Sequence, residues 1–465
     1  MSRKNHEENP VKTFTNIMII AVIVLFVLFS CGLIYECAII PGLSKKHDEF
    51  KKEAYFDYQF YECCEGRIVD CNDVDITVPT NEKAQTALID DDYAYAFGWI
   101  LGTRNVKLGI RNGIRTVHEF DLFDMSHRDR GATIKLTTDK EMQKYTYELL
   151  DQISDDGSII VLDNQSGAIK AFATRGPLAY NGNYHSDFND KSLSIEASRY
   201  MRGIYEQDPP ASVFKLVTLA CAIENEIDFS SSDFAQYYDD GTYDYSDGTF
   251  LTNYQNEVYG TVDLQKALNN SINTYFAYVS DTLGKDKLAK MYDKCLIGTN
   301  ITLDFRKDNT NVLYSSYNLE ENNASVSHSG IGQGLTQITP LHLTSIIASF
   351  ANEGKMMQPY MVQSVDGKDD FKAKPIKLSQ ICSKETCDKL NEYAHKCALS
   401  YGFSEEECGW VCAKTGTAQF DSQRKHSYLV AYNQKYTFLI SCNDVATSTQ
   451  LLNTMKTLLM QYKVN

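Results

Sequence analysis

The sequence has no excess of positive charge, no internal repeat and no long low-complexity tract. Its 45 lysines and arginines face 61 aspartates and glutamates, which gives a formal net charge of −16. Nucleic-acid binding needs clustered lysines and arginines, so no nucleic acid is expected as a partner. The lack of a fixed period excludes solenoid and propeller folds. The 13 cysteines in 465 residues are too dilute for a disulfide-stapled scaffold.

The composition is otherwise ordinary for a globular protein. Hydrophobic residues make up 43% of the chain and charged residues 23%, which argues against long disorder. At roughly 150 residues per domain, the length predicts about three domains, or two domains of which one is large.

One long apolar run lies near the N-terminus, between Lys12 and Glu36. As a helix it would extend about 34 Å, enough to cross a hydrocarbon layer of about 30 Å. A cleaved signal peptide has a shorter apolar core and small residues before the cut, and neither is clear here. Residues 28–31 (Leu-Phe-Ser-Cys) resemble a lipoprotein cleavage box, but the bulky Phe29 fits poorly. We therefore predict an uncleaved transmembrane anchor over residues 13–36. Positive charges lie on both sides of it, so the charge distribution does not show which end faces the cytoplasm.

The rest of the chain divides near residue 130. Residues 37–130 have short, mixed patterns and predict a small stalk domain, whereas residues 131–465 have a denser pattern. In this second part, Asp139 is a candidate N-cap for a helix to about Ile153. Thr339 and the following proline predict the start of another helix.

Strand patterns lie at both ends of the second part, with helices between them. Residues 157–172 predict one β-hairpin and residues 428–441 a second, followed by a helix from about residue 447. Residues 214–223 are apolar almost all round, as in a buried helix. This order predicts an α+β fold with an antiparallel sheet built from both termini and flanked by helices.

Ser212 and Lys215 form a Ser-x-x-Lys motif at the start of the predicted buried helix. One helical turn separates them, so both side chains lie on the same face. The helix N-terminus offers free N–H groups that suit a developing oxyanion. Burial would lower the pKa of Lys215, and the neutral amine could then activate Ser212. Alone the motif is weak, because residues 422–425 also match it and Ser212 could be an ordinary N-cap.

Ser271 and Asn273 form a Ser-x-Asn motif between two helical patterns. A hydroxyl there could relay a proton, and an amide could hold a substrate peptide bond. Residues 316–318 and 441–443 match the same pattern, so this motif alone has little weight.

Lys-Thr-Gly occurs once, as Lys414, Thr415 and Gly416, and is followed by Thr417. It comes after the apolar residues 410–413 and so predicts the edge strand of a sheet. Gly416 would let a substrate backbone pair closely with this strand. The lysine and the two threonine hydroxyls would bind a carboxylate beside the nucleophile. The alternative is a glycine turn that follows a strand.

In this order, the three motifs resemble the set shared by class A β-lactamases and penicillin-binding proteins. Over residues 131–465 the chain resembles class B penicillin-binding proteins, which are monofunctional peptidoglycan transpeptidases. It departs from them at Pro210-Ala211, where the family usually has Pro-Gly before the serine. Residues 37–130 are too few for the glycosyltransferase domain of class A members. The segments that carry the resemblance outside the motifs are residues 136–143, 157–167, 330–340 and 351–354, and more faintly 66–70.

The resemblance implies a penicillin-binding transpeptidase fold that includes an all-helical lobe and needs no metal or organic cofactor. It implies Ser212 as the acylated nucleophile and Lys215 as its general base. Ser271 would relay the proton, and Asn273 would hold the donor peptide.

The resemblance also assigns roles to the Lys-Thr-Gly segment. Lys414 and Thr415 would position the terminal carboxylate of the substrate, or its β-lactam equivalent, beside Gly416. The N–H groups of Ser212 and Thr417 would form the oxyanion hole.

The implied reaction is two-step acyl transfer on stem peptides that end in D-Ala-D-Ala, with β-lactams acylating the same serine. Peptidoglycan lies outside the cytoplasmic membrane. Residues 1–12 would therefore be a cytoplasmic tail, and residues 37–465 would be extracytoplasmic. The expected protein partner is a polytopic membrane peptidoglycan glycosyltransferase.

Two other functions stay open. The first is a β-lactam sensor or resistance protein, although the 12 residues before the anchor cannot supply a signalling domain. A β-lactamase would also need a deacylating base, which the motifs do not provide. The second is a catalytically silent scaffold in a cell-wall synthesis complex, against which the complete set of motif residues argues.

Eleven of the 13 cysteines lie between Cys63 and Cys442, beyond the predicted anchor; Cys31 lies within the anchor and Cys37 directly after it. An extracytoplasmic setting permits disulfides within two clusters, although their pairing stays open. No zinc-like Cys-x-x-Cys spacing is present, so no metal site is expected. The acidic residues 239–247 are expected to form a solvated loop. One cluster comprises Cys63, Cys64 and Cys71, and the other comprises Cys382, Cys387, Cys397 and Cys408. Outside the clusters, Cys221, Cys412 and Cys442 are expected to be buried.

Overall fold

The structure is a computed structural model. It describes residues 10–34, 60–175, 202–305, 312–368, 372–419, 425–443 and 448–464, with short gaps within residues 84–128 and at residues 247 and 321. The second Ser-x-x-Lys match begins in residues 421–424, which lie outside the described part.

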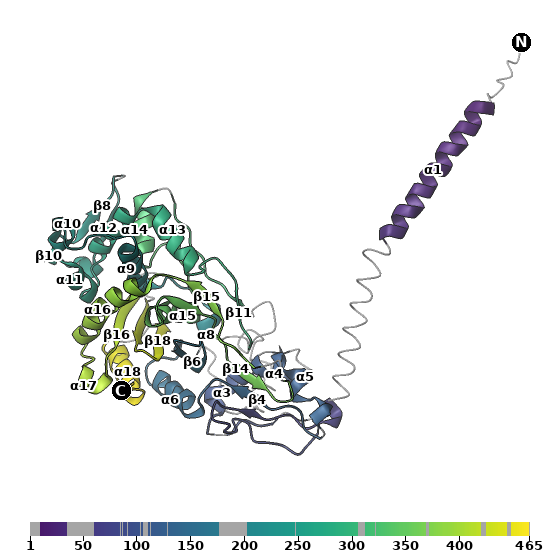
Figure 1. The fold of residues 1–465 in the computed structure, drawn as a ribbon, viewed down its shortest axis with the longest axis horizontal. Coiled ribbons are helices and arrows are strands. Elements are labelled where there is room, and N and C mark those ends of the chain that lie inside the picture. The colour runs from purple at the N-terminus through teal and green to yellow at the C-terminus, as the bar shows by residue number, and fades with distance from the viewer. Residues whose placement is uncertain are drawn as a thin grey trace, which may run out of the picture.

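A five-stranded antiparallel sheet occupies the centre of the larger part of the chain (Figure 1). Its order is β16-β17-β18-β5-β6, so the last strand of the chain pairs with the first strand of the hairpin. The predicted antiparallel sheet built from both termini is confirmed. The strands are β5 (Gly157–Asp163), β6 (Ile169–Arg175), β16 (Cys412–Gln419), β17 (Lys425–Tyr432) and β18 (Tyr436–Asn443).

Helices pack against this sheet where the sequence signals predict them. The Asp139 carboxylate accepts a hydrogen bond from Met142 N at the start of α6 (Lys140–Asp151). Thr339 caps α15 (Pro340–Ala351) in the same way. Helix α6 contacts strands β5 and β6, and helix α15 contacts strands β5 and β18. Helix α18 (Ser448–Gln461) packs on β17 and β18.

A second lobe lies beside the edge strand β16 and is mainly helical (Figure 1). The prediction that it is wholly helical is wrong, because two short two-stranded sheets lie between its helices. The sheets pair β7 (Tyr237–Asp239) with β10 (Gly260–Val262), and β8 (Thr242–Asp244) with β9 (Phe250–Thr252). The helices are α9 (Lys215–Glu224), α10 (Ser232–Ala235), α11 (Leu264–Asn269), α12 (Asn273–Leu283), α13 (Lys285–Lys294) and α14 (Asn323–Gly330).

Two predictions in this lobe have opposite outcomes. Helix α9 is buried on every side from Lys215 to Ala222, as its apolar sequence predicts. The prediction of a solvated loop at residues 239–247 is wrong for Asp239, which is fully buried. Its carboxylate can be buried because neighbouring N–H and O–H groups donate hydrogen bonds to it.

The residues on either side of position 130 share a sheet. Strand β1 (Ile68–Val69) pairs in parallel with β4 (Ile134–Leu136), which pairs in antiparallel with β14 (Val362–Val365). A buried ion pair between Arg115 Nε and Glu65, 3.0 Å apart, holds the segment before position 130 together. The boundary of the predicted stalk therefore crosses a continuous sheet.

Helix α1 (Pro10–Ile34) covers most of the predicted anchor. The described residues as a whole include no helix that is both long enough and apolar enough to cross a membrane. The anchor over residues 13–36 stays a prediction.

The eleven cysteines from Cys63 to Cys442 are all free thiols, and all but Cys71 are buried. In the predicted clusters the Sγ atoms of Cys382 and Cys387 lie 3.4 Å apart, well beyond a disulfide bond of about 2.05 Å. No disulfide joins the described residues of either cluster. The predicted burial of Cys221, Cys412 and Cys442 is confirmed.

Candidate active site

Ser212 lies in a short 3-10 turn, η4 (Ala211–Phe214), immediately before α9. The backbone of Ala211 is left-handed, with φ 52°, a conformation that glycine adopts most easily. This is the position where the resemblance leads one to expect glycine. The Ala211 N–H donates to the Gly332 carbonyl at 2.8 Å, which fixes the turn from outside.

Lys215 is fully buried one turn after the serine. Its Nζ donates to the Ser271 carbonyl at 2.6 Å and to Asn273 Oδ1 at 2.7 Å, with Ser271 Oγ at 3.2 Å. Burial, together with the nearby positive charge of Lys414, lowers the pKa of Lys215 well below its ordinary value of 10.5. A pKa lowered in this direction is what a general base requires.

The Ser-x-Asn motif occupies the turn between α11 and α12, as its position between two helical patterns predicts. Ser271 has a left-handed backbone with φ 56°, and Asn273 is the first residue of α12. Through Lys215, this turn is connected to the helix that follows the nucleophile.

The Lys-Thr-Gly segment lies on β16, the edge strand of the sheet, as predicted. Lys414 is fully buried, and burial lowers its pKa. A Cβ atom on Gly416 would lie 3.0 Å from Val213 N and 3.1 Å from Ser212 N. A glycine at this position thus allows β16 to pack directly on the turn that contains Ser212. This reason for the glycine differs from the predicted approach of a substrate backbone.

The three motifs meet at one cavity of about 200 Å³. Ser212, Ser271 and Asn273 line it from the helical lobe, and Thr415, Gly416 and Thr417 line it from β16. The remaining motif residues with charged side chains, Lys215 and Lys414, are buried and lie next to this lining. The remaining lining residues are Asn253, Tyr254, Glu257, Tyr259, Asn270, Ile272 and Gln333. The predicted site residues are therefore brought together, while their individual catalytic roles stay predictions.

Tyr401 is a site residue that the sequence does not reveal. It follows α16 (Lys384–Ser400), and its Oη lies 3.1 Å from Thr415 Oγ1 and 3.4 Å from Lys414 Nζ. Burial raises its pKa well above 10, so the phenol is protonated and can donate. No motif or spacing marks it, because only the fold brings the end of α16 onto β16.

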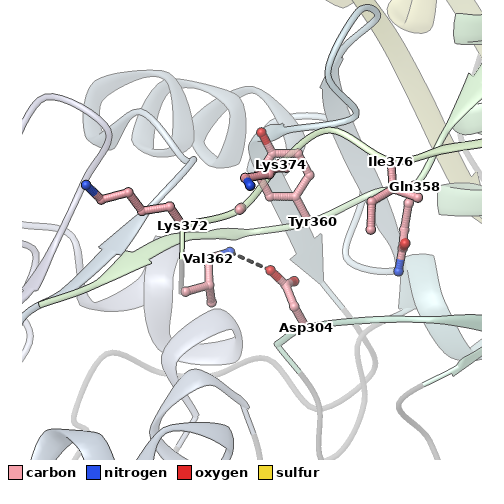
Figure 2. Close-up of a pocket in the computed structure, with 8 residues that line it drawn as sticks. Asp304, Gln358, Tyr360, Val362, Lys372, Lys374 and Ile376 are labelled. Atoms are coloured by element: carbon pink, nitrogen blue, oxygen red, sulfur yellow. Dashed lines mark hydrogen bonds between the residues drawn. The ribbon is translucent and has the colours of Figure 1, made fainter. Parts of the chain in front are cut away.

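A second cavity, of about 220 Å³, lies apart from the motifs (Figure 2). The carboxylate of Asp304 accepts hydrogen bonds from Met361 N and Val362 N, and burial raises its pKa to about 6. The Asp304 carboxylate in this cavity is thus already hydrogen-bonded to backbone N–H groups. Its lining comprises Asp304, Gln358, Tyr360, Val362, Lys372, Ala373, Lys374 and Ile376.

Asp70, Cys71 and Asp139 form a group with metal-like spacing in the described part of the chain. Asp70 Oδ1 accepts from the backbone N–H groups of Asn72 and Val74, and Asp139 caps α6. Turn and helix capping account for these carboxylates without an ion.

Comparisons with known proteins agree with this geometry. The family described as "Penicillin binding protein transpeptidase domain" matches residues 157–451. The chain is 27% identical over 304 residues to stage V sporulation protein D of Bacillus subtilis, covering 62% of this chain and 44% of that protein. It is 25% identical over 252 residues to peptidoglycan D,D-transpeptidase MrdA of Haemophilus influenzae, covering 51% of this chain and 37% of that protein. The chain therefore spans less than half the length of these two relatives.

Solved structures share the fold at lower sequence identity. PBPA from Mycobacterium tuberculosis is 19% identical, with a TM-score of 0.73, covering 86% of this chain and 99% of that one. A D,D-transpeptidase domain from Eggerthella lenta is 21% identical, with a TM-score of 0.71, covering 86% and 98%. The fold predicted from the motifs is confirmed.

Proposed function

This chain belongs to the penicillin-binding protein transpeptidase family, and from this membership and the geometry of the cleft we propose that it is a peptidoglycan D,D-transpeptidase. The observation that carries the proposal is the buried Lys215 amine. It contacts both Ser271 and Asn273 in the wall of the cleft that also exposes Ser212. A lysine held in this way is suited to remove a proton from a neighbouring hydroxyl.

The first half-reaction forms an ester on Ser212. Lys215 takes the hydroxyl proton, and Oγ attacks the carbonyl carbon of the penultimate D-alanine of the donor peptide. The N–H groups of Ser212 and Thr417 stabilise the negative charge on the carbonyl oxygen. The peptide bond breaks, and the released D-alanine nitrogen takes the proton from Lys215 through the Ser271 hydroxyl.

The second half-reaction transfers the acyl group to an amine of a neighbouring stem peptide. The amine attacks the ester carbonyl, its proton passes to Lys215, and the Ser212 oxygen regains a proton as the ester bond breaks. A new amide bond cross-links the two peptides.

The substrate carboxylate binds along β16. Lys414, on this strand, supplies a positive charge, and Thr415 and Thr417 supply hydroxyl groups in the cleft lining. A β-lactam presents its own carboxylate in the same way and acylates Ser212. Penicillin-binding protein A from Mycobacterium tuberculosis, which has a similar fold, has been solved as its penicillin G acyl-enzyme complex.

We also propose that residues 13–36 anchor the protein in the cytoplasmic membrane, with residues 1–12 inside and residues 37–465 outside. The exposed apolar side chains of α1, from Met18 to Phe29, support this proposal. A polytopic membrane peptidoglycan glycosyltransferase is the proposed partner. Cell fractionation tests the anchor, because the full chain should enter the membrane fraction and a chain beginning at residue 37 should not.

Turnover of a peptide that ends in D-Ala-D-Ala, in the presence of an acceptor amine, tests the reaction. The wild type should release D-alanine and form the new amide, and Ser212→Ala should do neither. Ser422→Ala, in the second Ser-x-x-Lys match, is the matched control and should keep wild-type turnover. Equal turnover by Ser212→Ala contradicts the proposal, and an inactive wild type favours a silent scaffold.

A further inference from the structure

Helix α12, which begins with the motif residue Asn273, lacks a cap from its own sequence. The N-cap position is Ile272, whose side chain cannot accept a hydrogen bond. Asn253, which follows β9, supplies the cap instead. Its Oδ1 accepts from Asn273 N at 2.9 Å and from Thr274 N at 3.2 Å. A residue twenty positions earlier in the chain thus satisfies the first N–H groups of the helix.

The orientation of the Asn253 amide is fixed by its other contacts. Its Nδ2 donates to both carboxylate oxygens of Asp239, at 2.9 and 3.0 Å, and to the Glu257 carbonyl at 3.0 Å. An amide has only two N–H donors, and both point at acceptors. A flipped amide would turn its donors toward the N–H groups of α12, so Oδ1 must face the helix.

Asp239 holds this arrangement from a fully buried position. Besides the Asn253 amide, its carboxylate accepts from Thr274 Oγ1 at 2.6 Å and from Tyr259 N at 2.7 Å. It therefore contacts both the capping residue and the first turn of α12. Loss of a partner inside such a buried network is costly, since the remaining polar groups stay unsatisfied.

A second contact fixes the side chain of Asn273. Its Nδ2 donates to the Thr252 carbonyl at 3.0 Å, which leaves Oδ1 facing Lys215 Nζ at 2.7 Å. Residues 252 and 253 thus hold both the backbone and the side chain of Asn273. A continuous chain of hydrogen bonds runs from Asp239 through Asn253 and Asn273 to Lys215.

We propose that Asp239 and Asn253 are positioning residues for acyl transfer: they set the place of Asn273 and, through it, that of the Lys215 amine. This inference rests on the proposed transpeptidase function. Neither residue belongs to the three motifs. Positioning at this point matters because the adjacent Ser271 has a left-handed backbone, a strained conformation that surrounding contacts must maintain.

The test measures acylation by a penicillin and separates the acylation rate constant from the binding constant of the preceding complex. In Asn253→Ala and Asp239→Asn we expect the rate constant to fall about 10- to 100-fold, since a displacement of about 1 Å has effects of this size. The binding constant should change less than the rate constant, because β16 is untouched and Asn253 is only one of the residues that line the cavity. Asn164→Ala is the matched control, a buried asparagine in the β5–β6 turn that bonds Asn433 O and Thr437 Oγ1. It should lower the melting temperature and keep the rate constant.

The melting temperature of each variant separates positioning from general loss of structure. A wild-type rate constant in folded Asn253→Ala would overturn the inference.

Hydrogen–deuterium exchange gives a readout that does not depend on activity. The amides of Asn273 and Thr274 should exchange faster in Asn253→Ala than in the wild type, and at the wild-type rate in Asn164→Ala. Unchanged exchange in Asn253→Ala overturns the inference even where acylation is lost. A wild type that no penicillin acylates overturns the proposed function, and the exchange rates then still decide whether Asn253 holds α12.

Discussion

Single residues around Ser212 hold conformations that the chain would not adopt on its own. Ala211 and Ser271 both have left-handed backbones, which disfavour a residue with a Cβ atom by about 1–2 kcal/mol. Gly416 has no Cβ and therefore lies flat against the turn that carries the nucleophile. Strain of this kind concentrates at functional sites, where the surrounding fold maintains it.

Gly416→Ala should slow acylation without unfolding the protein. The new Cβ would lie 3.0 Å from Val213 N and 3.1 Å from Ser212 N, both backbone atoms, so β16 and the nucleophile turn must separate. The neighbouring backbone must give by a few tenths of an ångström, so we expect penicillin acylation to slow by roughly tenfold, less than the ~100-fold effect of a displacement of about 1 Å. Gly298→Ala is the control: its Cβ meets open space but its backbone is left-handed, with φ 89°, so it should lower stability and keep the acylation rate. Wild-type acylation by Gly416→Ala would contradict the account.

The pH dependence of acylation should report on Lys215. Only the neutral amine accepts the Ser212 proton, so the rate falls as the pH falls through the pKa of Lys215. Because burial lowers this pKa, the acidic limb should lie well below pH 10.5. In Lys215→Arg the guanidinium stays protonated, and acylation should be absent at every pH. An acidic limb near pH 10.5 in the wild type would show that the lysine is not perturbed.

At the scale of elements, the site forms where α9, the α11–α12 turn and β16 meet. Helix α16 supports this junction from behind, because Tyr401 at its end contacts the side chains of both Lys414 and Thr415. Strand β16 is thus held by a helix that contributes no motif.

Tyr401→Phe should weaken binding more than chemistry. The substitution removes a hydroxyl that contacts Thr415 and Lys414, a neutral hydrogen bond of about 1 kcal/mol or roughly fivefold in affinity. We expect the dissociation constant of the preacylation penicillin complex to rise by this factor, with a smaller effect on the acylation rate constant. Tyr393→Phe, on the same helix, is the control. A larger loss in the rate constant than in affinity would place Tyr401 in the chemical step instead.

The elements that could be predicted from the sequence are those with local signals. Asp139 and Thr339 begin helices because their side chains accept backbone N–H groups two or three residues ahead, a contact readable from sequence alone. The motif residues could be predicted because their order and context resemble a family. Tyr401, Asn253 and Asp239 could not, since their contacts join segments distant in sequence and depend on the folded lobe.

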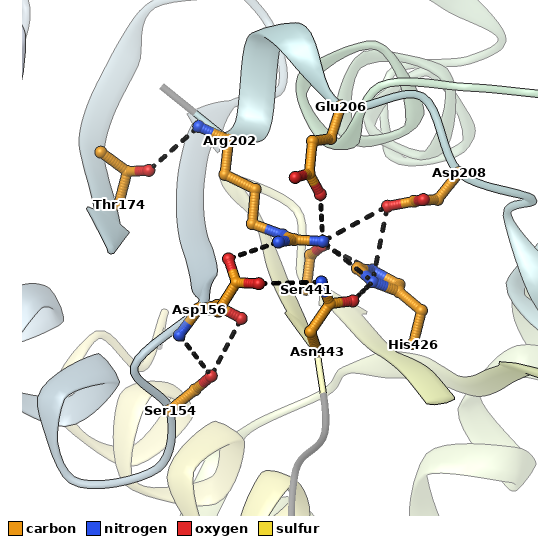
Figure 3. A network of polar contacts seen from close by, with 9 residues as sticks. All are labelled: Ser154, Asp156, Thr174, Arg202, Glu206, Asp208, His426, Ser441 and Asn443. Carbon is orange, nitrogen blue, oxygen red and sulfur yellow. Dashed lines mark hydrogen bonds and ion pairs between the residues drawn. The ribbon is translucent and has the colours of Figure 1, made fainter. Parts of the chain in front are cut away.

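At the scale of the whole molecule, one buried polar network connects a single end of the central sheet, where β5 and β17 begin and β6 and β18 end, with the segment before Ser212 (Figure 3). The fully buried Arg202 forms ion pairs with Asp156, Glu206 and Asp208. Asp208 also lies 3.5 Å from His426 Nδ1 on β17. One guanidinium thus pairs with three carboxylates, two from its own segment and one from the residue before β5.

The close approach of these buried carboxyl groups predicts a pH dependence of stability. Burial, with the charges of Asp208 and Asp156, raises the pKa of Glu206 from 4.5 to about 8, against the opposing effect of the Arg202 guanidinium beside it. The folded state then holds this proton more tightly than the unfolded state, so the stabilisation is complete below pH 4.5 and is lost as the pH rises through about 8. In Glu206→Gln, unfolding by urea should depend less steeply on pH between these values. An unchanged pH dependence would contradict the raised pKa.

The central claim is that Ser212 is the residue that accepts the acyl group. Labelling with a fluorescent penicillin, followed by peptide mapping of the adduct, tests it most directly. The account predicts one label per chain on the peptide that contains Ser212 and no label on Ser212→Ala, with the melting temperature of the variant near that of the wild type. Equal labelling of both proteins, or an adduct on any other residue, would contradict it.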